Sequence, residues 1–226
     1  MVRTADRLID LSLSSNDGAF LGGEDDLLRQ LEVSRPTLRQ AAKIAENDRL
    51  LSVRRGPRGG FYAARPDMGD AIRAMARHLR FMGTSLRDTL VVSRILSQEA
   101  AGAAALCTDP VQRETLARLS AGLADCDTAR AMIRQEHQVA MQIAEMSGNP
   151  LVKLVIAIGY SFGVEEQGPK IHESAEQRAQ NCALLQQICD AILDGDGEIA
   201  RLLTRRRSEK IWQWLGMTAE AGPAIS

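Results

Sequence analysis

Apolar residues recur at helical spacing near the start of the chain, and they predict three helices followed by two short strands. The helices are expected over residues 2–13, 24–31 and 34–47. A three-residue connection joins the second helix to the third, which is typical of a helix-turn-helix. Ser34 is expected to cap the third helix with its hydroxyl, and Pro36 suits its first turn. Residues 50–53 and 59–63 favour strands, and the glycine-rich tip at 56–59 predicts a β-hairpin wing.

The chain beyond residue 66 has only helical periodicity, without a period-two pattern or an internal repeat. Ser85 is a candidate N-cap there. We expect a mainly α protein in three parts: a winged helix-turn-helix domain over residues 1–66, with three helices and a hairpin wing; a bundle of six or seven helices over 67–215; and a disordered tail over 216–226. The bundle helices are expected over 67–82, 86–107, 110–124, 128–146, 151–162, 171–193 and 198–215, with a loop at 163–169.

Positive charge is concentrated around the third helix and the wing. Residues 34–66 carry eight basic and two acidic residues, whereas the whole chain has a net charge of −1. Arg35, Arg39 and Lys43 follow one another at intervals of four, so they share one helix face. Such a row alone suits an ordinary solvated surface. Together with the preceding turn and the basic wing, it indicates a surface that binds duplex DNA through phosphates and base edges.

Composition and motifs argue against a membrane protein, a secreted protein and an enzyme. The 226 residues suit two domains, and 45% hydrophobic with 25% charged residues predicts packed cores. No apolar run reaches the roughly 18–20 residues of a membrane span, and the first residues lack a signal-peptide pattern, so a soluble, cytoplasmic protein without a membrane partner is expected. No catalytic motif is present, so we do not expect an enzyme. The cysteines form no CxxC pair and are expected to be buried free thiols rather than a redox switch: Cys107, Cys126, Cys182 and Cys189.

The stretch from Leu21 to Pro66 resembles the winged helix-turn-helix domain of the GntR superfamily of bacterial transcription regulators. The resemblance rests on Glu24, Val33-Ser34-Arg35, Arg39-Gln40-Ala41 and the wing segment Gly56 to Phe61. It implies that the protein binds a DNA operator. In that setting Arg35 and Arg39 would read or clamp the major groove, and Thr37 and Lys43 would add base or phosphate contacts. The wing would contribute Arg58, with Gly59 and Gly60 allowing close approach to the minor groove.

One residue departs from the family pattern in a way that bears on DNA binding. Where the family usually has "LPSER", this chain has Leu21-Gly22-Gly23-Glu24-Asp25, so Asp25 replaces a basic residue expected to touch phosphate. A carboxylate there would repel the DNA backbone. This leaves an alternative function open, in which the chain is an effector-binding helical dimer whose DNA-binding domain has degenerated.

The helical part resembles the effector domain of the FadR branch of that superfamily, called FCD. The resemblance is carried by His137-Gln138, by Ser147 to Leu151, and by Ala191 to Asp196 followed by Ala200. It implies a homodimer that recognises a pseudo-palindromic operator and responds to a small-molecule effector, most often as a repressor.

Many members of this branch bind a divalent metal with one Asp and three His. On that pattern His137 is the only ligand retained, because Ile133 stands at the Asp position and Leu185 and Arg207 at the other two His positions. Since Ile, Leu and Arg cannot ligate a metal, no metal or other cofactor is expected. These four positions, together with Arg94, form the expected effector site of five residues. Ser93 would take the place of Arg94 if the alignment shifts by one.

Arg207 has two interpretations. It could replace the metal and bind a carboxylate of an anionic effector through its guanidinium fork; an inward arginine needs a partner, and the effector would supply it. Alternatively, Arg205, Arg206 and Arg207 are all solvated and favour the C-terminal part of their helix. Among the other candidates, His172 is expected at the surface, and Trp214 is expected to be the packed tryptophan.

Overall fold

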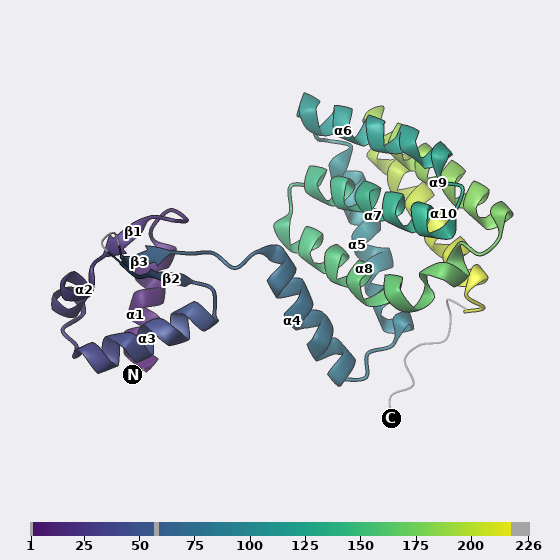
Figure 1. Ribbon diagram of the computed structural model, residues 1–226. Helices are drawn as coiled ribbons and strands as arrows, with labels where there is room; N and C mark the ends of the chain where they lie inside the picture. The colour runs from purple at the N-terminus through teal and green to yellow at the C-terminus, as the bar shows by residue number, and fades with distance from the viewer. Residues whose placement is uncertain (1, 57–58, 218–226) are drawn as a thin grey trace. The chain divides into compact units, whose positions relative to one another are not determined.

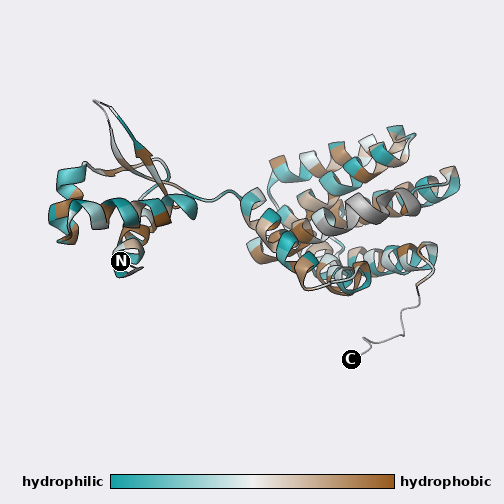
Figure 2. Cartoon of the chain, turned by 60° about the horizontal axis from the view of Figure 1, so that its bottom comes forward, coloured by the Kyte–Doolittle hydropathy of each residue, from teal (hydrophilic) through white to brown (hydrophobic). Residues whose placement is uncertain are grey.

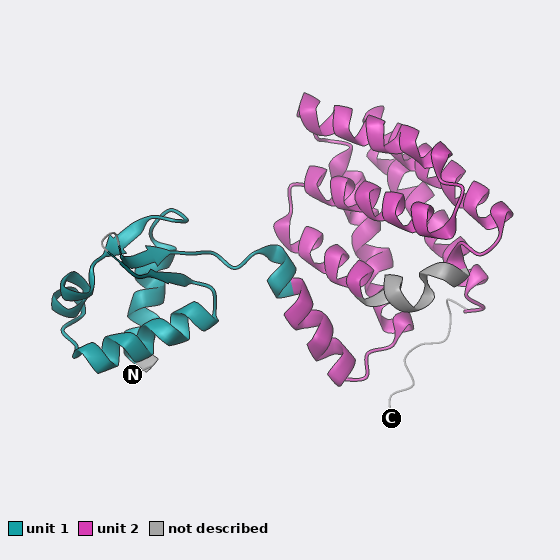
Figure 3. Ribbon diagram, in the orientation of Figure 1, with its two compact units in different colours: residues 1–71 teal, residues 72–226 magenta. Residues whose placement is uncertain are grey.

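The computed structural model describes residues 2–56 and 59–217, and for residue 2 and residues 162–170 it describes the backbone only. The chain divides into two compact units, residues 1–71 and 72–226 (Figure 3). The sequence placed the boundary at residue 66, where the wing ends. The few residues in between belong with the first unit, since Asp70 Oδ2 lies 2.5 Å from Arg49 Nη1.

The first unit is a winged helix-turn-helix, as predicted. It consists of α1 (Val2–Leu13), β1 (Phe20–Gly22), α2 (Glu24–Leu31), α3 (Arg35–Asn47), β2 (Leu51–Arg54) and β3 (Gly60–Ala63). The strands form an antiparallel sheet in the order β1-β3-β2 (Figure 1). Strand β1 was not predicted, because three residues are too few to show an alternating pattern; its pairing with β3, such as Phe20 with Tyr62, exists only in the folded unit.

The turn between α2 and α3 is made by a residue in the left-handed region. Glu32 has φ 55° and ψ 47° at the end of α2. Ser34 occupies the N-cap position of α3, but the predicted capping bond is absent from the described residues: its Oγ lies 2.8 Å from Oγ1 of Thr37 instead. The Ser34 hydroxyl therefore bonds to the Thr37 side chain and does not accept a backbone N–H of the first turn of α3.

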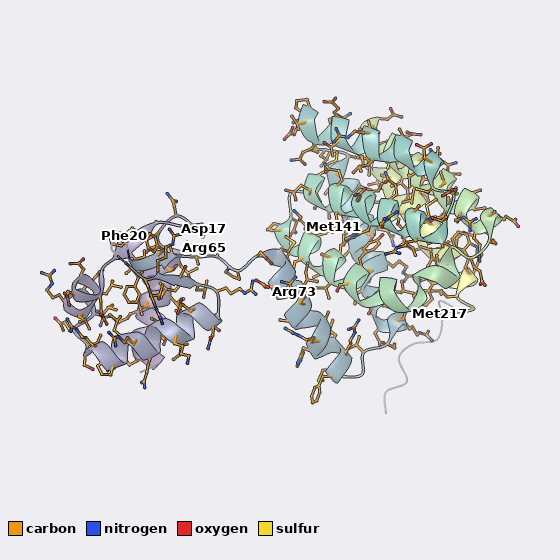
Figure 4. The ribbon with its side chains drawn as sticks, in the orientation of Figure 1. Asp17, Phe20, Arg65, Arg73, Met141 and Met217 are labelled. Carbon is orange, nitrogen blue, oxygen red and sulfur yellow. The ribbon has the colours of Figure 1, made fainter. Side chains whose placement is uncertain are left out.

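The predicted apolar stripes form the core of the first unit, with Leu8, Leu27 and Leu38 wholly buried. Arg65 ties the end of the wing to the end of α1. Its Nη2 donates to the carbonyl oxygens of Ser12, Leu13 and Ser15 at 2.9, 3.1 and 2.6 Å. Figure 4 labels this arginine beside the sheet. Because the last carbonyls of a helix have no partner within it, this guanidinium caps α1.

The second unit is an all-helical bundle, as predicted. Its helices are α4 (Met68–Phe81), which begins in the first unit, α5 (Leu86–Ala104), α6 (Pro110–Ala121), η1 (Gly122–Asp125), α7 (Ala129–Met146), α8 (Pro150–Ile171), α9 (Ala175–Leu193) and α10 (Gly197–Trp214). Helix α5 packs against α7, α8 and α10, and α6 packs against α7 and α9. Figure 2 shows hydrophobic and hydrophilic positions alternating along these helices, the pattern of amphipathic helices that share a core.

Most of these helices begin at a capping side chain. Ser85 caps α5, as predicted: its Oγ accepts from the Asp88 backbone N at 3.2 Å, and the Asp88 carboxylate accepts from the Ser85 backbone N at 2.9 Å. Such reciprocal bonds satisfy two donors that the helix itself leaves free. Similar side-chain caps start α6, α7, α8, α9 and α10 at Asp109, Thr128, Asn149, Ser174 and Asp196.

The predicted boundary between α8 and α9 and the predicted burial of Trp214 are wrong. The loop expected at 163–169 is helical, because α8 continues to Ile171, and α9 starts only at Ala175. The three residues 165–167 are strong helix formers, and they outweigh the glycines on either side. Trp212, rather than Trp214, is the buried tryptophan, with 4% exposure. Most of the tail expected to be disordered, residues 218–226, lies outside the described residues.

The cysteines are free thiols, as expected. Cys189 is buried, and the other three are half-buried. Burial raises the pKa of the Cys189 thiol to about 11. Across residues 2–56 and 59–217, none of the helices is both long enough and apolar enough to cross a membrane.

Candidate functional site

The basic face predicted on α3 is exposed. The side chains of Arg35 and Arg39 are 62% and 69% exposed, and Lys43 is exposed one turn further on. Leu38 and Ala41 lie on the opposite face and are fully buried. Burial of that apolar face against α1 and the sheet therefore directs the three cations outward from one side of the first unit.

A groove of about 830 Å³ separates α3 from the wing. Arg39 and Lys43 line it from α3, and Arg54 and Arg55 line it from the β2 side. The guanidinium of Arg54 lies 4.0 Å from the ring centroid of Tyr62, a cation–π arrangement that keeps this charge at the edge of the wing. Glu24 and Glu46 also line the groove, so its four cations face two carboxylates. The excess of positive charge suits a polyanion such as the DNA backbone.

The wing glycines are required by the hairpin itself. Gly60 has φ +153°, and a Cβ there would lie 2.5 Å from Cε2 of Phe20. A Cβ on Gly59 would lie 2.7 Å from the carbonyl oxygen of Arg54. Both glycines were expected to allow close approach to the minor groove; the packing within the hairpin requires them independently of DNA. Arg58, at the predicted tip, lies outside the described residues.

Acidic side chains of α2 face the basic row. Oδ1 of Asp25 lies 2.8 Å from Nη2 of Arg35. Arg39 is held by a fork, in which its Nε and Nη2 donate to the two carboxylate oxygens of Glu24 at 2.9 and 3.4 Å. The hydrogen bond to Asp25, followed by the charges of Asp25 and Glu24, raises the pKa of Arg35. Repulsion of DNA by Asp25 was expected from the sequence, whereas the pairing of Asp25 with Arg35 was not.

The second site is a cavity of about 120 Å³ inside the helical unit. It lies among α5, α7, α8 and α10, and its wall is largely apolar, with Leu90, Ile133 and Trp212 among the lining residues. Arg94 and Arg207 also line it, as does Ser93, the alternative to Arg94. The structure therefore brings together three of the five residues that the sequence proposed for effector binding.

The other two proposed residues lie elsewhere. His137 is exposed, and its ring centroid lies 5.0 Å from that of Tyr160. Leu185 packs in the bundle core with 4% exposure. The residue before His137, Glu136, lines the cavity in its place. Along α7, Glu136 continues the apolar stripe through Met132 and Val139, so its spacing was a signal that the sequence analysis missed.

Glu136 is the centre of a buried polar cluster contributed by four segments of the chain. Its Oε1 lies 2.5 Å from Nη2 of Arg207 and accepts a hydrogen bond from the Tyr160 hydroxyl at 3.2 Å. Its Oε2 lies 3.0 Å from Nε2 of His172 and accepts from Nδ2 of Asn181 at 3.1 Å. Nε of Arg207 donates to Oδ1 of Asn181 at 2.8 Å, which closes the network.

The burial of this cluster corrects two expectations. His172 was expected at the surface but is only 2% exposed. It lies directly after α8, and its Nε2 is 3.0 Å from Oε2 of Glu136. The Arg207 side chain is 12% exposed, whereas Arg205 and Arg206 are exposed, so the fully solvated interpretation of this row is wrong. The partner that an inward Arg207 requires is Glu136, a residue of the protein itself.

The ionisation of the cluster follows from its charges. Burial would raise the pKa of Glu136, but the charge of Arg207 and then the hydrogen bond and charge of His172 outweigh burial and leave this pKa far below its ordinary value. Burial would lower the pKa of Arg207, but the charge of Glu136 raises it overall. Burial and the charge of Glu136 raise the pKa of Tyr160. Glu136 and Arg207 therefore form an ion pair, and Tyr160 stays neutral.

Arg94 differs from Arg207 in having no carboxylate partner within the described part of the chain. Its Nε is buried and donates to no acceptor in the described part of the chain, and its guanidinium carbon lies 6.0 Å from the Trp212 ring centroid. A buried donor without a partner is costly to leave in place. Arg94 is thus a cation in the cavity wall with unused capacity to bind an anion; among the described residues, Nδ1 of His172 is also buried there without a hydrogen-bond partner.

The cavity residues do not fit a divalent metal. No group of three or more His, Cys, Asp or Glu is placed to hold an ion within residues 2–56 and 59–217. The carboxylate of Glu136 already faces Arg207, His172, Asn181 and Tyr160, and a cation there would lie beside a guanidinium. The carboxylate of Glu136 is thus already engaged by side chains of the protein.

The fold is shared with a known structure. Streptococcus agalactiae GntR superposes with a TM-score of 0.70 at 20% identity, covering 93% of this chain and 98% of that one. Weaker matches are Lar, described as controlling expression of the Listeria monocytogenes agr system (TM-score 0.49, 16% identity, 96% of each chain), and E. coli McbR/YncC (0.48, 18%, 95% of this chain and 97% of that one). The fold assignment rests on the first. No protein-family model matches the sequence, and no curated protein matches it significantly.

Proposed function

We propose that this protein is a transcription regulator of the GntR superfamily, of the FadR branch with an FCD-type helical domain, which binds an operator through its first unit. The exposed cationic face of α3 beside a cation-lined groove carries the proposal. A helix of this kind can enter the major groove while a wing contacts the adjacent backbone. The shared fold with S. agalactiae GntR supports this arrangement.

The regulator would act as a homodimer, so its operator would be pseudo-palindromic. Binding of an effector in the helical unit would change the placement of the two DNA-binding units, and repression relieved by the effector is the direction we expect. Such control requires the effector to bind the DNA-competent and DNA-incompetent states with different affinities.

The proposed effector is a small monoanion that binds without a metal. Arg94 and Arg207 bring two positive charges to the cavity, and Glu136 compensates the second of them. One charge is left for a ligand carboxylate. An engineered cavity of about 150 Å³ holds benzene, so the cavity of about 120 Å³ suits an apolar body of similar size.

DNA binding can be tested by selecting sequences from a random duplex library and measuring affinity for the enriched duplex in a gel-shift titration. Arg39→Ala should weaken binding about tenfold or more. Arg130→Ala, which removes an exposed arginine at the start of α7, should leave it unchanged. Equal effects of the two substitutions would contradict the assignment of α3.

The effector class can be tested by thermal shift with benzoate and hexanoate against benzyl alcohol and hexanol. The carboxylates should raise the melting temperature more than their neutral counterparts, and Arg94→Gln should remove the difference because it removes the uncompensated charge. A preference for the alcohols, or an undiminished carboxylate preference in Arg94→Gln, would argue against an anionic effector held by Arg94.

A second candidate function is an effector-binding dimer without DNA affinity. It is favoured by the ion pairs that Asp25 and Glu24 form with the two arginines of α3. A folded dimer that shows no salt-dependent binding to any duplex would support it.

A further inference from the structure

The first turn of α2 carries the acidic groups that meet the arginines of α3, and the two pairs differ in geometry. Glu24 engages Arg39 through both Nε and Nη2. Asp25 engages Arg35 through Nη2 alone, at 2.8 Å. An arginine has five N–H donors in a fixed plane, two of them on Nη2. Asp25 takes one N–H of Nη2, so the second N–H of Nη2 and one neighbouring donor, on Nε or Nη1, remain as a free edge of the Arg35 guanidinium while its position is held.

These pairs are too exposed to serve mainly as stabilising contacts. The side chains of Arg35 and Asp25 are 62% and 76% exposed. Exposed ion pairs contribute little to stability, because water and dissolved ions screen them. The pair of Asp25 with Arg35 has a larger effect on the position of the Arg35 guanidinium and on the net charge that an approaching phosphate meets.

Phosphate and base contacts respond differently to a nearby carboxylate. Phosphate contacts add affinity for every sequence alike, whereas hydrogen bonds to base edges distinguish sequences. Asp25 cancels part of the attraction of Arg35 for phosphate. It leaves a planar pair of donors on Arg35 that can reach N7 and O6 of a guanine.

We infer that Asp25 is a positioning residue that sets sequence specificity, an inference that rests on the proposed function. Asp25 would hold the Arg35 guanidinium for a base contact and lower the affinity of Arg35 for phosphate. The single bond to Nη2, the free donor pair of Arg35 and the exposure of both side chains carry this inference. Asp25 thus lowers the affinity of the protein for random-sequence DNA more than it lowers the affinity for the preferred site.

The test compares Asp25→Asn with the wild-type protein on two probes: a random-sequence duplex and the duplex that the wild-type protein enriches from a random library. Asp25→Asn should bind the random duplex more tightly, and the slope of log affinity against log salt should steepen by about 0.9, which corresponds to one more phosphate contact. The ratio of specific to random affinity should fall.

Asp17→Asn is the matched control, since it removes an equal charge from an exposed position of the same unit, in the loop before β1 (Figure 4). Charges beyond about 8 Å are largely screened at physiological salt, so this variant should behave as the wild-type protein does. If Asp25→Asn matches Asp17→Asn in slope and ratio, or binds the random duplex less tightly than the wild-type protein, the inference is wrong.

A second variant keeps the test decisive if Asp25→Asn does not fold. Arg35→Lys retains the charge but lacks the planar fork, so it should lose about 5- to 150-fold for the enriched duplex while keeping its affinity for the random one. An equal loss on both probes would make Arg35 a phosphate contact and overturn the inference. Absence of salt-dependent binding by the wild-type protein and all variants would instead overturn the proposed function.

Discussion

Removing the charge of Glu136 should destabilise the helical unit strongly. In Glu136→Gln the side chain keeps its size, but Arg207 remains buried without the carboxylate that lies 2.5 Å from it. Tyr160 and His172 also lose a charged acceptor. Breaking a buried ion pair by removing one partner typically costs about 3–5 kcal/mol, because the remaining charge is left uncompensated. That is a large part of a typical free energy of unfolding of about 5–15 kcal/mol.

The loss should depend on pH in a defined direction. The pKa of Glu136 lies far below its ordinary value of 4.5 in the folded protein. A carboxyl group with a lowered pKa stabilises the fold at pH values above its unfolded pKa, and this contribution disappears as the pH falls toward the folded pKa. The difference between the wild-type protein and Glu136→Gln should therefore be constant from pH 7 to about pH 5, and it should shrink below the ordinary value of 4.5.

Tryptophan fluorescence during urea unfolding measures the free energy of unfolding of the helical unit. The two tryptophans of the chain, Trp212 and Trp214, both lie in α10. Protein concentration must be held fixed, since dimerisation would shift the apparent stability. The control is Glu145→Gln on the same helix, which breaks the more exposed pair with Lys153 and should cost less than about 1 kcal/mol.

A double variant separates the buried charge from loss of packing. Glu136→Gln combined with Arg207→Met should recover most of the lost stability, because no uncompensated charge remains. The reasoning is refuted if Glu136→Gln loses no more stability than Glu145→Gln, or if the double variant is less stable than Glu136→Gln alone.

Three further predictions concern the first unit. Gly60→Ala should destabilise it by about 1–3 kcal/mol, because the new Cβ meets the Phe20 ring at 2.5 Å; an unchanged thermal transition by circular dichroism would show that the wing adapts. Arg65→Ala should cost about 1.5–3 kcal/mol in the same assay through loss of charged hydrogen bonds to the end of α1, and a loss below about 0.5 kcal/mol would contradict that role. Lys43→Ala should reduce the salt slope of DNA binding by about 0.9 for any duplex, and a loss confined to one sequence would make Lys43 a base contact instead.

Local patterns were enough to predict the winged helix-turn-helix unit and most of the bundle. The buried face of α3 through Leu38 and Ala41, and the row of Arg35, Arg39 and Lys43 opposite, follow from helical periodicity alone. The three-stranded sheet was only partly predicted, because β1 is too short to carry a pattern and is defined by its pairing with β3.

The interior of the helical unit was predicted only in outline. Periodicity could place Glu136 on the apolar face of α7, which is a signal of burial, but it could not identify Arg207, 71 positions further along the sequence, as its partner. Assignment by family resemblance chose His137 instead, one residue away, and a shift of one residue turns a helical side chain by about 100°.

The sequence by itself determined most of the helices, the two wing strands and the apolar face of the helices in the first unit, because these depend on backbone geometry repeated every few residues. The tertiary structure alone decided which charges meet: Asp25 with Arg35 across a turn, and Glu136 with Arg207 across a core. Ion pairs form only within about 4 Å, and only the packing of whole helices brings residues from separate helices within that distance.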